Sequence, residues 1–348
     1  MHSHVHSCIA LLCFLHTQAA AGAGLNFTGD PFTDAAHDPR NPLRYIPSFP
    51  LTTIAVVLFI LVALTQTWCL FKYGGRYMLT MVIGEYIMVV GLTLRYAFRE
   101  NPHSLAIYIA HTLCVVVAAP CAFIASTYVL LGRLARFVEC DEALLIAPQY
   151  ITRIFVISDI STFLIQAAGG GASASASSNG GSVIPGARIS LVGVILQLVS
   201  FVVFTFLYLV FMIRVYTGRK DLWTKHRNQG WQSDWRSLAF ALGIGCLGII
   251  IRSVFRTVEL SEGYGGHLST TESYFYALDA LPLIIAVGVY ILVWPGKFIP
   301  SGLDLRRPQN KASDDIGEGG AVYRDGNGYQ LDARGSSAIS SSTALNNA

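Results

Sequence analysis

The feature that most constrains this chain is an apolar run from Ser237 to Leu260 that carries three charged residues. The run is long enough to cross a bilayer, because a spanning helix needs about 20 predominantly apolar residues. Within it, Arg252, Arg256 and Glu259 follow helical spacing, so a helix places all three on one face. Each arginine costs about 2.5–3.5 kcal/mol at the centre of a membrane helix. We therefore expect this face to look into a helix bundle or a wet cavity rather than at lipid.

The rest of the chain shares this apolar character and predicts an all-α, polytopic membrane protein. Hydrophobic residues make up 53% of the 348 residues and charged residues only 13%, against about 25% charged residues in soluble domains. Apolar stretches of bilayer length predict seven transmembrane helices. They cover about residues 50–71, 77–98, 105–131, 152–168, 189–213, 237–258 and 273–294.

The distribution of Lys and Arg predicts which side of the membrane each loop faces. The loops after spans one, three and five contain eleven Lys and Arg residues, whereas the N-terminal segment and the opposite loops contain four. The positive-inside rule then predicts the N-terminus outside and the C-terminus inside. An N-glycosylation acceptor, Asn26-Phe27-Thr28, is usable in this orientation.

The chain outside the spans divides by composition. Residues 1–24 combine a short apolar core with a run of small residues, which favours a signal peptide over a retained N-terminal extension. Residues 25–49 then form an extracellular segment, 50–296 the seven-helix transmembrane domain, and 297–348 a disordered cytoplasmic tail. The loop after span four, GGGASASASSNGGSVIPGA, is expected to be a flexible outside connection.

Charged residues gather at one depth of the predicted bundle. Counting along the spans places Arg95, Arg252, Arg256, Glu259 and Asp279 near the outer leaflet. In the arrangement we expect, Asp279 and Glu259 neutralise two of the three arginines. Net positive charge is then left for a lipid headgroup phosphate or another anion. The alternative is a satisfied ion-pair network that only locks the helices together, and it stays open for each residue.

Four further polar residues inside the spans are candidates for substrate binding or translocation. Glu85 lies toward the inside in span two, and Gln197 lies in the outer half of span five. Asp159 and Gln166 share one face of span four. Asp159 is either a proton-coupling group or a buried aspartate bonded to a neighbouring helix.

Other residues are expected to have structural rather than functional roles. Pro120 in span three and Pro282 in span seven should bend their helices and free backbone carbonyls. His111 is expected to be packed and hydrogen-bonded rather than a ligand. Seven cysteines, most of them in apolar stretches, predict no structural disulfide. We expect no metal site and no cofactor, and the dispersed basic residues argue against nucleic-acid binding.

Many of these residues also form a family pattern. The most specific piece is Arg252-Ser253-Val254-Phe255-Arg256 with Glu259 in span six. Further matching residues in the other spans are Ala119, Pro120, Phe123, Ala125, Tyr128, Gly132, Arg133, Asp159, Gln166, Gly169, Gly170, Gly171, Gly193, Gln197, Glu272, Tyr276, Asp279, Pro295 and Gly296. Over about residues 45–300, the chain resembles the fungal lipid-translocating exporter family. This seven-span group includes the sphingoid long-chain base exporter and the aminocholesterol- and toxicant-resistance proteins.

The resemblance implies a fungal plasma-membrane protein that moves lipids or amphipathic toxic compounds to the outer leaflet and confers resistance to them. Sphingoid long-chain bases and sterol-like compounds are examples. Membrane lipids or amphipathic small molecules would be its partners, and no protein partner is indicated. The chain lacks the Walker A pattern G-x-x-x-x-G-K-[ST], so we do not expect it to hydrolyse ATP or to be an enzyme.

A seven-helix receptor or sensor of lipid stress, signalling through a cytoplasmic partner, is the alternative. The number of spans and the predicted orientation suit it, but no D-R-Y or N-P-x-x-Y type signature is present. Span seven has no lysine for a retinal Schiff base. An intramembrane enzyme built on His111 and Asp279 has no motif spacing behind it.

Overall fold

The computed structural model describes residues 32, 35, 38, 41–138, 140, 144–218, 234–263 and 266–299. This part of the chain is helical and contains no β-strand, which confirms the all-α fold class. The predicted signal peptide at 1–24, the glycosylation acceptor Asn26 and the tail from residue 300 onward lie outside the described residues.

Seven candidate membrane spans occur in the described ranges, as the apolar pattern predicted, and they indicate a multi-pass membrane protein. Their helices are α2 (Phe49–Tyr73), α3 (Leu79–Glu100), α4 (Leu105–Thr112) continued by η3 (Leu113–Ala118) and α5 (Ala119–Phe137), α6 (Pro148–Ser178), α7 (Ile184–Gly218), α9 (Trp235–Glu262), and α11 (Glu272–Tyr274) continued by η6 (Phe275–Ala280) and α12 (Leu281–Leu292). Which side of the membrane each end faces stays a prediction.

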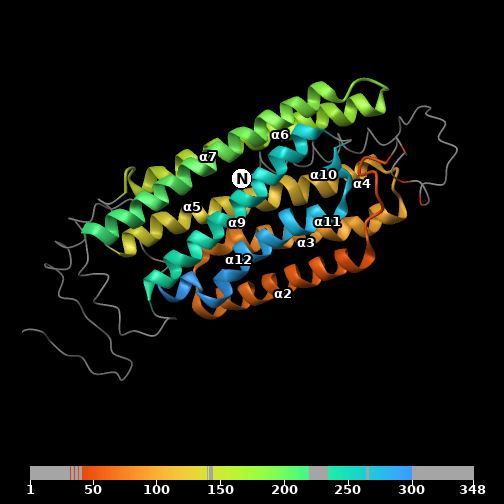
Figure 1. The fold of residues 1–348 in the computed structure, drawn as a ribbon. Helices are drawn as coiled ribbons and strands as arrows, with labels where there is room; N and C mark the ends of the chain where they lie inside the picture. Colours follow the sequence, from red (N-terminus) through yellow and green to blue (C-terminus); the bar gives the residue numbers. More distant parts are fainter. Residues whose placement is uncertain are drawn as a thin grey trace, which may run out of the picture. The chain divides into compact units, whose positions relative to one another are not determined.

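The spans form a ring in chain order. Each packs on the next, from α2 through α3, α5, α6, α7 and α9 to α12, and α12 returns to α2. Across the ring, α5 also contacts α9. Figure 1 shows α6 and α7 on one side and α2 on the other, with α9 and α12 between them. In the span that contains α9, 61% of the most apolar 18-residue stretch is buried inside the bundle. In the spans of α2 and α7, the buried share of this stretch is 33%. The arginine-bearing helix is therefore the most enclosed, as its charged face requires.

Glycines allow α9 to approach its neighbours closely, as the sequence indicated. A Cβ atom on Gly248 would lie 2.5 Å from the Pro282 carbonyl oxygen of α12. One on Gly245 would lie 3.1 Å from the Tyr290 hydroxyl, and one on Gly243 3.0 Å from the Tyr208 hydroxyl. Close backbone contact of this kind is typical of membrane helices joined through small residues.

The prediction of a long flexible loop after span four is wrong. Helix α6 continues through the glycine and serine-alanine run to Ser178, and α7 already begins at Ile184. Alanine is the strongest helix former, and Gly169 lets α6 pack closely on Gly186 and Ser190 of α7, so tertiary contact offsets the glycine penalty. The short turn is fixed by the Ser173 hydroxyl, which donates to Val183 O at 3.1 Å, and by Gly180 at φ +69°.

Candidate functional site

Two prolines shape the backbone around the arginines of α9. Proline lacks an N–H and clashes with the carbonyl four residues earlier, so the preceding turn cannot keep α-helical bonding. A π-helical segment precedes each proline, η3 before Pro120 and η6 before Pro282. The carbonyl four residues before Pro120 belongs to Val116, and the Arg252 Nη2 donates to it at 3.1 Å and to Val115 O at 3.0 Å. The bend and freed carbonyls predicted for Pro120 thus become a binding site for one arginine.

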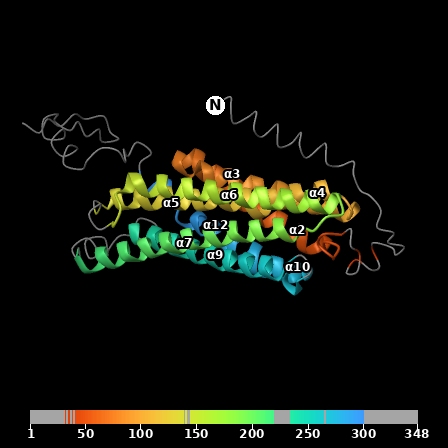
Figure 2. The ribbon, with the colours of Figure 1, turned by 90° about the horizontal axis from the view of Figure 1, so that it is seen from above.

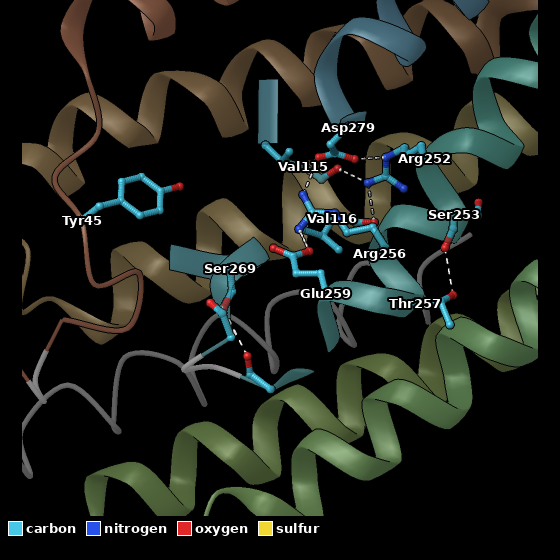
Figure 3. A network of polar contacts seen from close by, with 12 residues as sticks. Tyr45, Val115, Val116, Arg252, Ser253, Arg256, Thr257, Glu259, Ser269 and Asp279 are labelled. Atoms are coloured by element: carbon cyan, nitrogen blue, oxygen red, sulfur yellow. Dashed lines mark hydrogen bonds and ion pairs between the residues drawn. The ribbon is translucent and has the colours of Figure 1, made fainter. Parts of the chain in front are cut away.

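Asp279, in η6, contacts both Arg252 and Arg256 of α9. Its Oδ1 lies 2.6 Å from Arg252 Nε, and its Oδ2 accepts a short hydrogen bond from Arg256 Nη2 (Figure 3). Arg256 Nη1 also donates to Glu259 Oε2 at 2.6 Å. We call Arg252, Arg256, Glu259 and Asp279 the Arg–Asp cluster. It joins spans six and seven, whose charges the sequence placed at one depth, and Arg252 extends it to the span-three carbonyls, which the sequence did not predict.

The Arg–Asp cluster is closed in this structure. The side chains of Arg252 and Arg256 are 6% and 8% exposed, and Asp279 is fully buried. Glu259 is the most accessible member, at 13%. A headgroup could reach the guanidiniums only after a partner such as Asp279 moves away. The structure therefore shows a sealed arrangement of the charges.

Arg95 forms no ion pair with a member of this cluster among the described residues. Its Nη2 donates to Glu272 Oε1 at 3.0 Å and to the Tyr45 hydroxyl at 3.1 Å. The ring of Phe275 lies against both arginines, 4.4 Å from Arg95 Cζ and 5.5 Å from Arg256 Cζ. A cation over an aromatic face is stabilised by the ring quadrupole. Phe275 thus connects the Arg–Asp cluster to the Arg95–Glu272 pair.

Glu272 is a site residue that the sequence reasoning missed as a charge partner. With Glu272, the Arg–Asp cluster and the Arg95–Glu272 pair together contain three carboxylates and three arginines. Their formal charges therefore balance, and the expected net positive charge is not left over. The signal was present in the sequence, since Glu272, Tyr276 and Asp279 follow the spacing of one helical face.

A second polar group lies between α5, α6 and α7. Gln166 Nε2 donates to Gln197 Oε1 at 2.9 Å, and Gln197 Nε2 contacts the sulfur of Cys121 at 3.6 Å. Asp159 is 5% exposed and lies near Tyr128. Within the described part of the chain, neither oxygen of Asp159 accepts a hydrogen bond of good geometry.

Glu85 stands apart from both groups. It is fully buried in α3, and its two oxygens have no hydrogen-bond partner among the described residues. His111 is buried, and its Nδ1 lies 2.8 Å from Gly91 O, so it is a bonded core histidine as expected. Cys69, Cys114, Cys121, Cys140 and Cys246 are free, and no group of His, Cys, Asp and Glu in the described ranges could hold a metal ion.

The chain just before α2 is tied to the same end of the bundle as Arg95. Ser48 N donates to both oxygens of Glu272 at 2.9 Å, and Arg99 Nη1 donates to Pro47 O at 2.6 Å. Asp38 is fully buried and lies 2.6 Å from His103 Nε2. We call the described residues 38 and 41–48 the strap. It connects the ends of α3 and α11.

Replacing Glu272 with alanine is expected to release the strap. Ser48 N loses its acceptor and Arg95 loses its carboxylate partner, and a buried charge without an ion-pair partner is costly. Amide exchange at Ser48 should rise at least about tenfold, which corresponds to about 1.4 kcal/mol of lost protection. Hydrogen–deuterium exchange with mass spectrometry measures this. Glu100→Gln, which changes an exposed carboxylate at the same end of α3, is the control. Equal protection in Glu272→Ala and wild type would show that the strap is held by other contacts.

Comparison with known proteins gives a family match and several relatives. In Saccharomyces cerevisiae, Protein RTA1 is 27% identical over 64% of this chain and 66% of its own length. Protoporphyrin uptake protein 1 is 28% identical over 57% of this chain and 62% of its own length. Sphingoid long-chain base transporter RSB1 is 25% identical over 60% of this chain and 61% of its own length. The chain thus covers less than two thirds of each relative. No solved structure matches it.

The family match includes most of the bundle. A family described as RTA1 like protein matches residues 81–302, which is more than half of the chain. The matched range contains the Arg–Asp cluster, the Arg95–Glu272 pair and the polar group of Asp159, Gln166 and Gln197. The chain therefore belongs to the RTA1-like protein family.

Proposed function

We propose that this protein is a plasma-membrane transporter that moves lipids or amphipathic toxic compounds toward the outer leaflet and so confers resistance to them. Seven apolar helices and membership of the RTA1-like family support a membrane role. Among the relatives, one is named a sphingoid long-chain base transporter and another a protoporphyrin uptake protein. Both names refer to the movement of amphipathic molecules. The outward direction, the substrates and the plasma membrane belong to the proposal.

The observation that carries the proposal is the buried Arg–Asp cluster between spans three, six and seven. Charged side chains inside a membrane bundle are costly and are typical of substrate or ion pathways. A bundle that needed only rigidity would be served as well by apolar packing, because replacing buried ion pairs with apolar residues is often neutral or stabilising. The cluster therefore supports a role in handling charge.

The same contacts suggest how the cluster would work. A headgroup phosphate would compete with Asp279 for Arg252 and Arg256 through paired hydrogen bonds to guanidinium. The two π-helical segments, η3 and η6, carry the groups that hold Arg252. π-helical turns are rare and frequently mark functional sites. A change in the backbone geometry of either segment would move these groups relative to α9 and open the cluster.

Charge-conserving substitutions provide the test. In Arg252→Lys and Arg256→Lys, a compact ammonium cannot reproduce the several directed contacts of each guanidinium. We expect movement of fluorescent sphingoid base and phospholipid analogues across reconstituted liposomes to fall at least about tenfold, which is about 1.4 kcal/mol. Arg236→Lys is the matched control, because Arg236 lies at the other end of α9, paired with Asp234.

The liposome measurement also separates the two classes of function. Movement by wild-type protein without added nucleotide supports a transporter, whereas a receptor would need a cytoplasmic partner to give a signal and would leave the lipids in place. If both Arg→Lys variants fold and move lipids at the wild-type rate, the Arg–Asp cluster only locks the bundle. If the wild-type protein moves none of these lipids, the proposed function is wrong for these compounds.

A further inference from the structure

The turn between α2 and α3 is held against the segment that follows α12. Trp294 Nε1 donates to Gly74 O at 2.9 Å, and the Tyr77 hydroxyl donates to Ile299 O at 3.4 Å. A Cβ atom on Gly296 would collide with Gly74 O, so the two backbones touch. These contacts fix the end of span one against the end of span seven, at the opposite end of α2 from the strap.

Two lysines from these segments lie over one aromatic ring. Lys72, in the last turn of α2, has its Nζ 5.3 Å from the centroid of the Tyr73 ring. Lys297, in η7 (Pro295–Lys297), has its Nζ 4.5 Å from the same centroid. The two ammonium groups therefore lie within about 10 Å of each other, the distance over which charges interact at 0.1 M salt. A cation over an aromatic face is stabilised, but its charge is not neutralised.

No carboxylate balances these charges in the described part of the chain. Lys72 and Lys297 are exposed, and neither forms an ion pair among the described residues. Arg133 of α5 adds a third positive charge beside the same turn, since its Cζ lies 4.3 Å from the Tyr77 ring. The buried Nε and Nη1 of Arg133 donate to no acceptor in the described ranges. Like charges gathered in one place repel each other, so this group favours a negatively charged ligand.

The surface beside the lysines has the character of a membrane interface. Trp68, whose ring lies 4.4 Å from Lys72 Nζ, and Phe71 are exposed on α2. Exposed aromatic rings next to lysines at the end of a spanning helix are typical of the headgroup level of a bilayer. In the predicted orientation this end faces the cytoplasmic leaflet, which contains anionic lipids. A phospholipid headgroup is therefore the anion that is present at this depth.

We propose that Lys72 and Lys297 bind the phosphate of an anionic phospholipid that stays in place and joins the end of span one to the end of span seven. The two ammonium groups donate to the phosphate oxygens, and Arg133 adds to the positive potential of the site. The acyl chains lie along Leu61 and Leu64, which share the exposed face of α2 with Lys72. This lipid is a resident ligand and not a transported one, so the site does not depend on the proposed function.

Lipid binding by the full-length protein in nanodiscs tests the site. The nanodiscs contain phosphatidylcholine alone or phosphatidylcholine with a minor share of phosphatidylserine, and native mass spectrometry measures the anionic lipid that the protein retains. We expect the double variant Lys72→Gln/Lys297→Gln to bind phosphatidylserine at least about tenfold more weakly than wild type. Arg153→Gln/Arg214→Gln is the matched control, because it removes two exposed positive charges from α6 and α7 on the same predicted side. It should bind like wild type.

Thermal unfolding gives a second readout, which separates lipid binding from a direct effect of the lysines on folding. Phosphatidylserine should raise the Tm of wild type and of the control, and this gain should shrink as salt is raised. The Lys72→Gln/Lys297→Gln protein should show no gain, but should unfold at the wild-type temperature in phosphatidylcholine alone. If the double variant does not fold, photoactivatable phosphatidylserine on wild-type protein should label α2 and residues 294–299.

Several results would overturn the site. These are equal retention of phosphatidylserine by wild type and Lys72→Gln/Lys297→Gln, an equal loss in the control pair, or labelling that avoids α2 and residues 294–299. Inorganic phosphate added to phosphatidylcholine nanodiscs separates the two sources of phosphate, because equal stabilisation by it would make a free anion the ligand and overturn the lipid. Binding is measured without transport, so absence of lipid movement in liposomes would reject the proposed function and leave this site standing.

Discussion

Replacing Asp279 with alanine is expected to lower the free energy of unfolding by about 3–5 kcal/mol, the usual cost of removing one partner from a buried ion pair. Asp279 is fully buried and contacts both Arg252 and Arg256. Its loss leaves Arg252 with the carbonyls of η3 and leaves Arg256 with Glu259 alone. Thermal or denaturant unfolding of the purified protein in detergent measures the effect.

Glu259→Gln is the matched comparison for this prediction. Within the described residues Glu259 forms an ion pair with Arg256 alone; it is partly exposed and would keep a hydrogen-bond acceptor after the substitution. We expect a much smaller loss of stability than for Asp279→Ala. Equal effects of the two changes, or an Asp279→Ala protein with wild-type stability, would contradict the view that Asp279 is the centre of the cluster.

Three consecutive glycines in α6 should respond very differently to alanine. A Cβ atom on Gly169 would collide with the backbone nitrogen of Ser190 and would lie 2.7 Å from Gly186 O, whereas one on Gly170 or Gly171 would meet no described atom within 4 Å. Because the neighbour of Gly169 is backbone, the two helices must separate to admit the methyl group. We expect Gly169→Ala to lose most of the folded protein.

Gly170→Ala and Gly171→Ala are the controls. Alanine favours the helix over glycine by up to about 1 kcal/mol, so these variants should be as stable as wild type or slightly more stable. Size-exclusion chromatography and thermal unfolding of all three variants give the comparison. Wild-type behaviour of Gly169→Ala would mean that α6 and α7 pack less closely than the structure shows. Loss of folding in Gly170→Ala would mean that this part of α6 has other contacts.

The sequence predicted the larger part of this arrangement from local patterns. Hydrophobic length gave the seven spans, and helical spacing placed Arg252, Arg256 and Glu259 on one buried face. Counting residues along spans six and seven placed Asp279 at the same membrane depth as these three residues. Pro120 and Pro282 indicated irregular backbone, which the structure shows as the π-helical segments η3 and η6. All of these depend on the periodicity and chemistry of neighbouring residues.

The sequence-based predictions that were wrong or incomplete share one physical cause: they depend on contacts between helices. The glycine and serine-alanine run was interpreted as a loop because its composition is typical of linkers. In the folded chain it is helical, and Gly169 at its start packs on Gly186 and Ser190 of α7. Depth counting placed Arg95 near the other charges but left one arginine without a carboxylate; in the structure Glu272 is the partner of Arg95, and the Phe275 ring lies near both Arg95 and Arg256.

The sequence by itself determined that this chain is a seven-span helical membrane protein with a charged face on its sixth span. Only the tertiary structure decided which acceptor each of the buried arginines contacts: Asp279 for Arg252 and Arg256, the Val115 and Val116 carbonyls for Arg252, and Glu272 for Arg95. Helical periodicity fixes the direction of a side chain relative to its own helix. The rotation and depth of the neighbouring helices, which bring acceptors within 3 Å, depend on packing between residues far apart in the sequence.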